Sequence, residues 1–110
     1  MASIEDFKKI EMKIGKIESA ERVPDTDKLL RLVVDFNEEE PRQVVSGINE
    51  FFEDPQALVG VKCPFVTNLE PRKIRGLESQ AMILAVITED RVFSILEPTL
   101  NDIPAGTTLS

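Results

Sequence analysis

Three cations crowd into four positions of a chain that is acidic overall. Arg72, Lys73 and Arg75 lie in the stretch "NLEPRKIRGLESQAM", residues 68–82, between a proline and a glycine. The planar guanidinium of arginine suits bidentate contacts to phosphate, while lysine acts as a point charge. This spacing predicts a loop that meets the phosphates of a nucleic acid. Taken alone, the same residues also fit a solvated loop that offsets nearby carboxylates.

The net charge argues against a nucleic-acid partner, because phosphate contacts dominate such affinity. The formal charge of the 110 residues is −7. Between residues 60 and 76, however, four cations face one anion, so this window carries +3 and the remainder −10. Acidic residues gather elsewhere, for example in the run at residues 38–40. A positive patch on a negative body is expected to bind one face of a polyanion and to repel it elsewhere.

The residue types that most catalytic and metal sites require are missing. Histidine is absent and Cys63 is the single cysteine, which removes imidazole bases and makes a structural zinc site implausible. Neither GxGxxG nor GxxxxGK[ST] occurs, so both nucleotide fingerprints are absent. We therefore expect no catalytic residue, no metal, no cofactor and no small-molecule substrate.

Length and hydropathy predict a single cytoplasmic domain over residues 1–110. The longest apolar run covers residues 81–87, far short of the roughly 20 residues of a membrane span. The first 17 residues mix charges of both signs and contain no apolar core of a secretory signal. One cysteine cannot form an internal disulfide, which suits a reducing compartment. We expect no membrane association.

Alternation of apolar and polar residues predicts a mostly β chain. The expected strands cover residues 12–23, 29–36, 43–46, 61–67, 80–87 and 91–96. A short helix is expected over residues 4–9, and another between the third and fourth strands, with Asp54 as N-cap and Gly60 past its end. Gly15 is expected to mark a bend or bulge, and Pro64 an edge or bulge.

The order of three strands, a helix and two strands is that of a five-stranded Greek-key barrel, the OB-fold, whose loops and strand faces bind oligonucleotides. The fold class predicted is therefore all-β. The N-terminal helix and the C-terminal hairpin are additions to this barrel. Other small barrels share the strand count.

Three stretches, in this order, resemble the tRNA-binding domain of the methionyl-tRNA synthetase C-terminus. They are "IEMKIGKIESAERVPDTDKLLRLVVDF", "RQVVSGI" and "LVGVKCPFVTNLEPRKIRGLESQAMIL". The same module occurs in free-standing structure-specific tRNA-binding proteins and in synthetase cofactors of the endothelial-monocyte-activating-polypeptide type. The resemblance covers about residues 4–96, and "NLEPRKIRGLESQAM" is its most distinctive part.

The resemblance implies an OB barrel that binds the outer corner of the L-shaped tRNA by shape and has no catalytic activity. In free-standing members the barrel forms a homodimer through elements outside it. Since no synthetase catalytic domain is present in these residues, we expect a separate chain that assists methionyl-tRNA synthetase or acts alone.

The same resemblance assigns residues to two surfaces. Contacts to tRNA are expected from Lys28, Ser46, Asn68, Arg72, Lys73, Arg75, Ser79 and Met82. Dimer contacts are expected from Ile4, Phe7, Val92 and Phe93. Alternatives stay open: Asn68 could cap a turn, Ser79 could bind backbone, and Met82 could lie in the core.

Neighbouring residues receive structural roles. Ile74 is expected to be buried and to orient the cationic loop, and Gly47 to permit a tight exit from the third strand. Phe51 and Phe52 are expected to pack on the core, and Cys63 to be a small buried hydrophobe.

Two other function classes remain open at this point. The chain could be a module that docks on a synthetase or another protein. It could instead resemble a chaperone-like protein of bacterial secretion, which shares the barrel and would bind unfolded peptides, although the motif loops of that relative differ.

Overall fold

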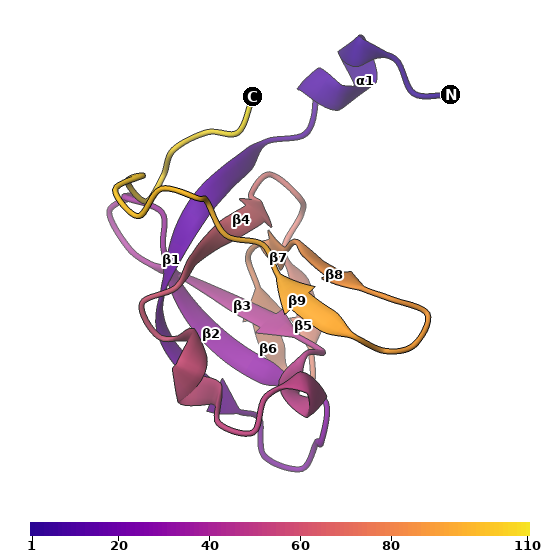
Figure 1. Cartoon of the computed structure of the whole chain (residues 1–110), viewed down its shortest axis with the longest axis vertical. Coiled ribbons are helices and arrows are strands. Elements are labelled where there is room, and N and C mark those ends of the chain that lie inside the picture. Colours follow the sequence, from indigo (N-terminus) through magenta and orange to yellow (C-terminus); the bar gives the residue numbers. More distant parts are fainter.

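A computed structural model describes residues 1–110 as a five-stranded, nearly closed barrel (Figure 1). Its strands are β1 (Met12–Arg22), β2 (Leu30–Asp35), β3 (Arg42–Ser46), β4 (Lys62–Val66) and β7 (Met82–Ile83). They pair antiparallel in the order β3-β2-β1-β4-β7. This order confirms the all-β, OB-like barrel predicted from the sequence.

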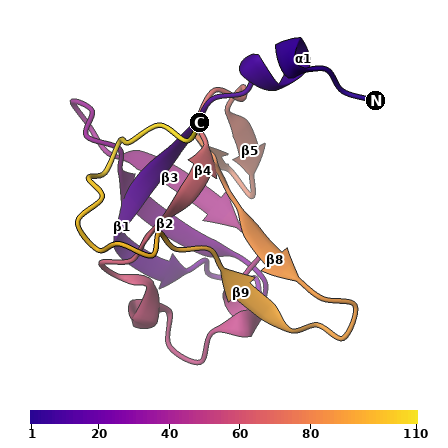
Figure 2. The same cartoon turned by 45° about the horizontal axis from the view of Figure 1, so that its top comes forward.

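Short helices and two hairpins complete the chain. They are α1 (Ile4–Lys8), the 3-10 helices η1 (Asn49–Phe51) and η2 (Pro55–Leu58), the hairpin of β5 (Arg72–Ile74) with β6 (Leu77–Ser79), and the hairpin of β8 (Ala85–Ile87) with β9 (Phe93–Ile95). Helix α1 and the β8–β9 hairpin project away from the barrel (Figure 2). None of the helices has the length and hydropathy of a membrane-spanning segment.

Both predicted helices begin where the capping residues indicated. The Ser3 side chain accepts from the Asp6 N–H, and the Asp6 carboxylate accepts from the Ser3 N–H, which completes a capping box before α1. The Asp54 carboxylate accepts from the Gln56 N–H at the start of η2, with Pro55 at its first position.

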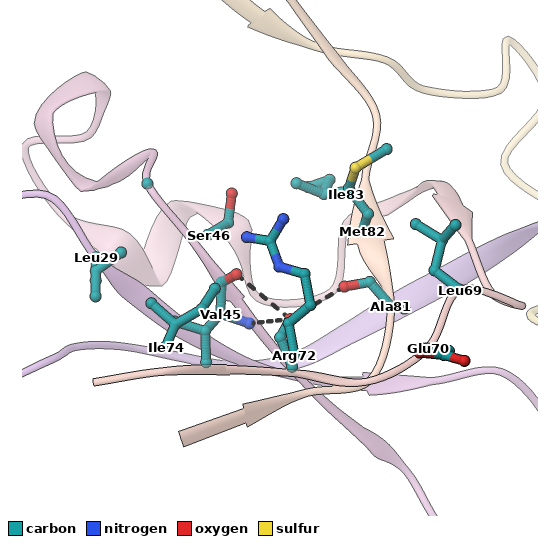
Figure 3. A pocket seen from close by; sticks show the side chains of 12 residues that line it. Leu29, Val45, Ser46, Leu69, Glu70, Arg72, Ile74, Ala81, Met82 and Ile83 are labelled. Carbon is teal, nitrogen blue, oxygen red and sulfur yellow. Dashed lines mark hydrogen bonds between the residues drawn. The ribbon is translucent and has the colours of Figure 1, made fainter. Parts of the chain in front are cut away.

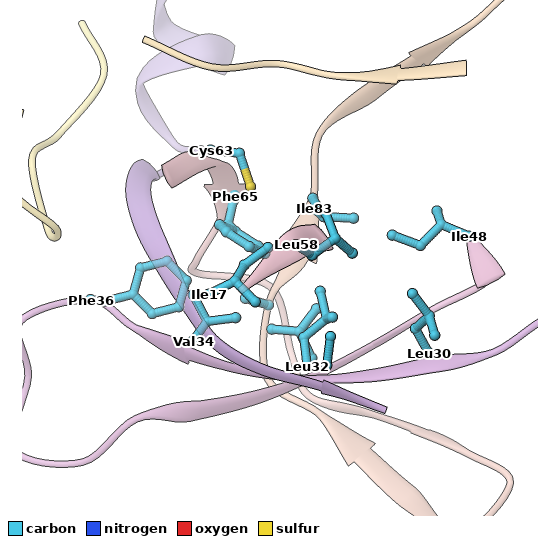
Figure 4. Close-up of a cluster of buried hydrophobic side chains, with 13 residues drawn as sticks. Ile17, Leu30, Leu32, Val34, Phe36, Ile48, Leu58, Cys63, Phe65 and Ile83 are labelled. Atoms are coloured by element: carbon cyan, nitrogen blue, oxygen red, sulfur yellow. The ribbon is translucent and has the colours of Figure 1, made fainter. Parts of the chain in front are cut away.

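The core fills the barrel with alternate residues of its strands (Figure 4). In β2 the inward residues Leu30, Leu32 and Val34 are fully buried, which is the period-two pattern of a half-buried strand. The Phe36 ring meets the Phe65 ring edge to face, with centroids 5.2 Å apart. Cys63 is buried here, as expected, and burial raises the pKa of its thiol to about 12.

The bulge of β1 lies closer to the C-terminal end of the strand than the sequence predicts. Gly15 pairs regularly with Cys63, and the register shifts between Ile17 and Ser19 instead. A Cβ on Gly15 would lie 2.5 Å from Val34 Cγ1 and 2.6 Å from the Phe36 ring. Glycine is therefore required at this position by packing, not by a bulge, and the prediction is corrected accordingly.

Pro64 does not mark an edge or a bulge, because β4 lies between β1 and β7. The residue opposite it, Ile14, donates its N–H to the Thr107 carbonyl (2.8 Å) and accepts from the Gly106 N–H (2.7 Å). Ile14 therefore has no backbone group left for Pro64. The missing N–H of proline thus breaks no bond between β1 and β4.

The strand predicted over residues 80–87 divides in two. Met82–Ile83 pairs with β4, whereas Ala85–Ile87 leaves the barrel and pairs with β9. All three residues of β8 are exposed. A continuous apolar run is typical of a strand buried on both faces, but half of this run serves a projecting hairpin.

Candidate nucleic-acid interface

The cationic segment forms a β-hairpin, not the loop predicted from the sequence. Ile74 pairs with Leu77, which leaves Arg75 and Gly76 as a two-residue turn. Both have left-handed backbone, with φ of 53° and 80°, as a type I′ turn requires. Only Gly76 signalled this turn in the sequence, because arginine is not among the residues that type I′ turns prefer at the first position.

The hairpin distributes its three cations over different directions. Arg72 pairs with Ser79 and Lys73 with Glu78, and successive side chains of a strand point to opposite faces. Arg72 therefore shares a face with Ile74, and Lys73 occupies the other face. Arg75 lies at the turn. The structure does not bring the three cations together on one surface.

A groove of about 320 Å³ opens between the hairpin, the end of β3 and β7 (Figure 3). It is lined by Leu29, Val45, Ser46, Gly47, Leu69, Glu70, Arg72, Ile74, Ser79, Ala81, Met82 and Ile83. Four of the residues predicted to contact tRNA are among them. The Arg72 side chain points into the groove (Figure 3).

Two of these four present free groups to a ligand. The Met82 side chain is 46% exposed, so it is not a core residue. The half-buried Ser46 hydroxyl makes no hydrogen bond within the chain. Lys28 is exposed next to the groove-lining residue Leu29, and its carbonyl accepts from the Asn49 N–H, which fixes the turn.

Ser79 serves the barrel. Its hydroxyl oxygen is buried and accepts from the Val45 N–H (3.0 Å), and the hydroxyl lies 3.1 Å from the Ala81 carbonyl. Gln80, which sequence reasoning missed, acts alongside it: its Oε1 accepts from the Gln43 N–H and its own N–H donates to the Gln43 carbonyl, both at 2.8 Å. These bonds from Ser79 and Gln80 satisfy backbone groups of β3 and thereby hold the β5–β6 hairpin to the barrel.

Asn68 connects the N-terminal segment to the end of β4. Its Oδ1 accepts from the Glu11 N–H (2.8 Å) and its Nδ2 donates to the Lys9 carbonyl (2.7 Å). The Thr67 hydroxyl donates to the Glu11 carboxylate nearby (2.7 Å). Asn68 therefore has a structural role, but it bridges two distant segments and does not cap a turn, which was the alternative that the sequence left open.

The arginines of the hairpin differ from all others in the chain. Arg22, Arg31, Arg42 and Arg91 each donate to oxygen atoms of the chain. Arg72 and Arg75 make no such bond. The Glu70 carboxylate lies at the edge of the groove, turned away from the Arg72 guanidinium (Figure 3), and the two form no ion pair.

Lys62 does not belong to this positive surface, although it contributes to the positive window of the sequence. Its Nζ donates to the carbonyls of Asn101 (3.1 Å) and Ile103 (2.7 Å) in the C-terminal segment. Ile74, expected to be buried, is half-buried against the groove. Lys62 is therefore held by the chain itself, whereas Arg72, Lys73 and Arg75 of the hairpin make no ion pair.

Gly47 has no structural reason to be glycine, contrary to the prediction of a tight exit. Its φ is not left-handed, and a Cβ built there meets no atom within 4 Å. Because Gly47 lines the groove, its missing side chain leaves the groove open.

Three of the four residues predicted for a dimer interface are exposed, namely Ile4, Phe7 and Val92. Phe93 is half-buried: its ring stacks on Phe51 at 4.5 Å and meets Phe52 edge on at 5.6 Å. Phe51 and Phe52 pack on the core, as expected.

No group of three or more acidic, histidine or cysteine side chains gathers where it could hold a metal.

Comparison with known proteins agrees with this geometry. Residues 12–108 match the family model described as "Putative tRNA binding domain". The chain belongs to this family. Its relatives include the methionine–tRNA ligases of Helicobacter pylori strain J99, 46% identical over 108 residues, and of Methanospirillum hungatei, 50% identical over 105 residues. These matches cover 98% and 96% of this chain but only 16% and 15% of the ligases.

Two solved structures of nearly the same length as this chain share its whole fold. A MetRS-related protein from Pyrococcus horikoshii is 35% identical with a TM-score of 0.91, covering 100% of this chain and 98% of that protein. The chaperone CsaA from Bacillus anthracis is 30% identical with a TM-score of 0.87, covering 100% and 99%. The fold of this chain thus occurs in solved structures of nearly the same length as well as in segments of longer ligases.

Proposed function

We propose that this chain binds folded tRNA by its shape, through the groove and the β5–β6 hairpin, and that it catalyses no reaction. One observation carries the proposal: in a member of the tRNA-binding family, the two arginines without intramolecular partners lie on one hairpin beside an open groove. Four other arginines of the same chain are held by its own oxygen atoms. Guanidinium groups left free in this way are available to phosphates.

The predicted contact residues take different roles in this proposal. Arg75 and Lys28 face the RNA backbone beside the groove, and the Arg72 guanidinium donates to the RNA from within the groove. Ser46 and Met82 contact the ligand inside it. Lys73 lies on the opposite face of the hairpin and contacts a separate backbone segment.

Asn68 and Ser79 contribute indirectly. Asn68 holds the N-terminal segment to the end of β4, and Ser79 holds the hairpin to β3. Their replacement would move the cations instead of removing a contact to tRNA.

We further propose that the chain works in the cytoplasm with methionyl-tRNA synthetase, as a homodimer. The identity to segments of two methionine–tRNA ligases supports the partner. Exposed apolar residues on the elements that project from the barrel support a second copy as partner, in particular Ile4, Phe7 and Val92. Sedimentation of Val92→Glu against the control Val59→Glu tests the dimer: loss of the dimer in the first alone is expected.

Titration with folded tRNA, unfolded tRNA and duplex DNA at two salt concentrations tests the main proposal. Folded tRNA is expected to bind most tightly, and its affinity to fall steeply with salt because counterions are released. Equal affinity for all three ligands, or an affinity that salt does not change, would exclude shape-specific phosphate binding.

A second candidate function is peptide binding. The chaperone CsaA shares the fold at 30% identity, and the groove has a largely apolar lining. An unfolded peptide that competes with tRNA for the groove, or binds where tRNA does not, would favour this function.

A further inference from the structure

The interior of the groove does not suit a phosphate group. Seven of its twelve lining residues are hydrophobic. Moving a charged, strongly hydrated group against such a surface costs free energy unless every charge is paired. The ligand that fits has apolar faces and a polar edge.

The rim of the groove offers partners for both parts of such a ligand. Met82 and Leu69 are 46% and 44% exposed, so their side chains provide apolar surface that the fold does not use. The Arg72 guanidinium points into the groove, and the Ser46 hydroxyl has no partner in the chain. A thioether packs well on an aromatic ring, and a guanidinium either stacks on a base or donates to its edge.

The open side of the groove is kept free by Gly47. Neither its backbone conformation nor its packing requires glycine. A missing side chain without a structural cause is typical of a place where a ligand approaches closely.

We propose that the groove binds one unpaired nucleobase of the RNA, with its face on Met82 and Leu69 and its edge at Arg72 and Ser46. Arg75 and Lys28 then contact the phosphates of the neighbouring nucleotides. This inference rests on the proposed tRNA function and names the part of the RNA that enters the site. Unpaired bases in loops are the groups that proteins commonly extract from folded RNA.

Charge favours a base over the side chain of a peptide. The cations around the groove lack intramolecular partners, and the nearest carboxylate in its lining, Glu70, is turned away from Arg72. A nucleotide brings a phosphate for these cations together with an apolar ring. A neutral peptide would leave them unpaired.

Methionine methyl NMR tests the site directly, because the chain has three methionines in different positions. Met82 lines the groove, whereas Met1 and Met12 lie outside it and serve as internal controls. Upon addition of folded tRNA, or of an RNA stem-loop with unpaired loop bases, the Met82 methyl signal is expected to shift upfield through the ring current of the base. A fully paired RNA duplex is expected to leave it in place.

Affinity measurements separate the base site from phosphate contacts. Met82→Ala is expected to weaken tRNA binding roughly two- to tenfold, with the salt dependence unchanged. Met82→Leu, which keeps the volume, is expected to bind nearly as the parent protein does. Val59→Ala is the matched control, since Val59 is 43% exposed and lies outside the groove.

The outcomes distinguish this inference from the proposed function. If tRNA binds in a salt-dependent way but neither the Met82 methyl nor the Met82→Ala affinity changes, the base site is wrong and phosphate binding stands. If no RNA binds, the proposed function fails and the base site fails with it. A Met82 shift caused by unfolded peptide but not by RNA would assign the groove to peptides and overturn the inference.

Discussion

Arg42 and Arg72 show two uses of the same residue type in one small barrel. Arg42 donates through Nε and Nη2 to the Glu38 carboxylate (2.9 and 2.8 Å) and through Nη1 to the carbonyls of Thr67 (2.6 Å) and Gln80 (3.2 Å). Its guanidinium also lies 5.4 Å from the centroid of the Phe36 ring. Arg72 makes none of these bonds and points into the groove.

The difference shows how an acidic chain keeps a positive surface. Arg31, Arg42 and Arg91 are paired with carboxylates of the chain, and the donors of Arg22 are engaged by amide and carbonyl oxygens. The cations of the hairpin keep their charge available because Arg72, Lys73 and Arg75 form no ion pair within the chain. Location of the partners, and not the number of cations, decides where a polyanion would bind.

The largest expected effect is on the free energy of unfolding, which should depend on Arg42 in the barrel but not on Arg72 in the hairpin. Replacing Arg42 with alanine removes the donors of two carbonyls, one of them on the buried residue Thr67, and is expected to lower the free energy of unfolding by about 3 kcal/mol. Arg72→Ala is expected to change it by less than about 0.5 kcal/mol. Urea denaturation of both variants measures this, and equal losses would remove the distinction.

A smaller effect on stability, a gain instead of a loss, is expected from a replacement at the hairpin turn. Arg75 has φ of 53°, a conformation that asparagine tolerates better than arginine. Arg75→Asn is expected to stabilise the chain by about 0.5 kcal/mol, because an Asn-Gly turn is preferred, and to weaken tRNA binding several-fold. Thermal unfolding and tRNA titration of the same variant check both signs. If the variant loses stability, or binds tRNA as tightly as the parent protein, the conclusion that Arg75 is present at this turn in order to bind tRNA is wrong.

The smallest expected effect concerns the pH dependence of the Arg42 region. The hydrogen bond from Arg42 lowers the pKa of Glu38 below its ordinary value of 4.5. A depressed carboxyl pKa contributes stability above the ordinary value, and this contribution is lost as the pH falls through the lower folded pKa. Glu38→Gln is therefore expected to cost about 0.5 kcal/mol at pH 7 and nothing in strong acid. Unfolding curves across this range measure the difference.

The barrel was predictable because its signals are local. Alternation in residues 30–35 and the capping residues Ser3 and Asp54 determine strand faces and helix starts within a few positions of the chain. The position of the β1 bulge was not predictable, since Gly15 is required by Val34 and Phe36 from another strand. Likewise, the exposure of β8 depends on its pairing with β9 and not on its own apolar sequence.

The candidate site was predictable in its residue types but not in its geometry. The resemblance placed Ser46, Arg72 and Met82 near one another, and the groove contains all three. It could not show that Lys73 points to the opposite face, because that depends on the register of the hairpin. The roles of Gln80 and Asn68 depend on partners 37 and 57 residues away in sequence.

A double replacement tests the central claim most directly. Arg72→Ala with Arg75→Ala is compared with Arg22→Ala combined with Lys62→Ala, which removes the same charge from residues that are bonded within the chain. The hairpin variant is expected to bind folded tRNA about 10- to 100-fold more weakly, with a salt slope shallower by about 1, because Arg75 is the phosphate contact of the pair. The control is expected to bind within about threefold of the parent protein. Equal losses in both variants would mean that net charge, and not the unpaired arginines of the hairpin, governs binding.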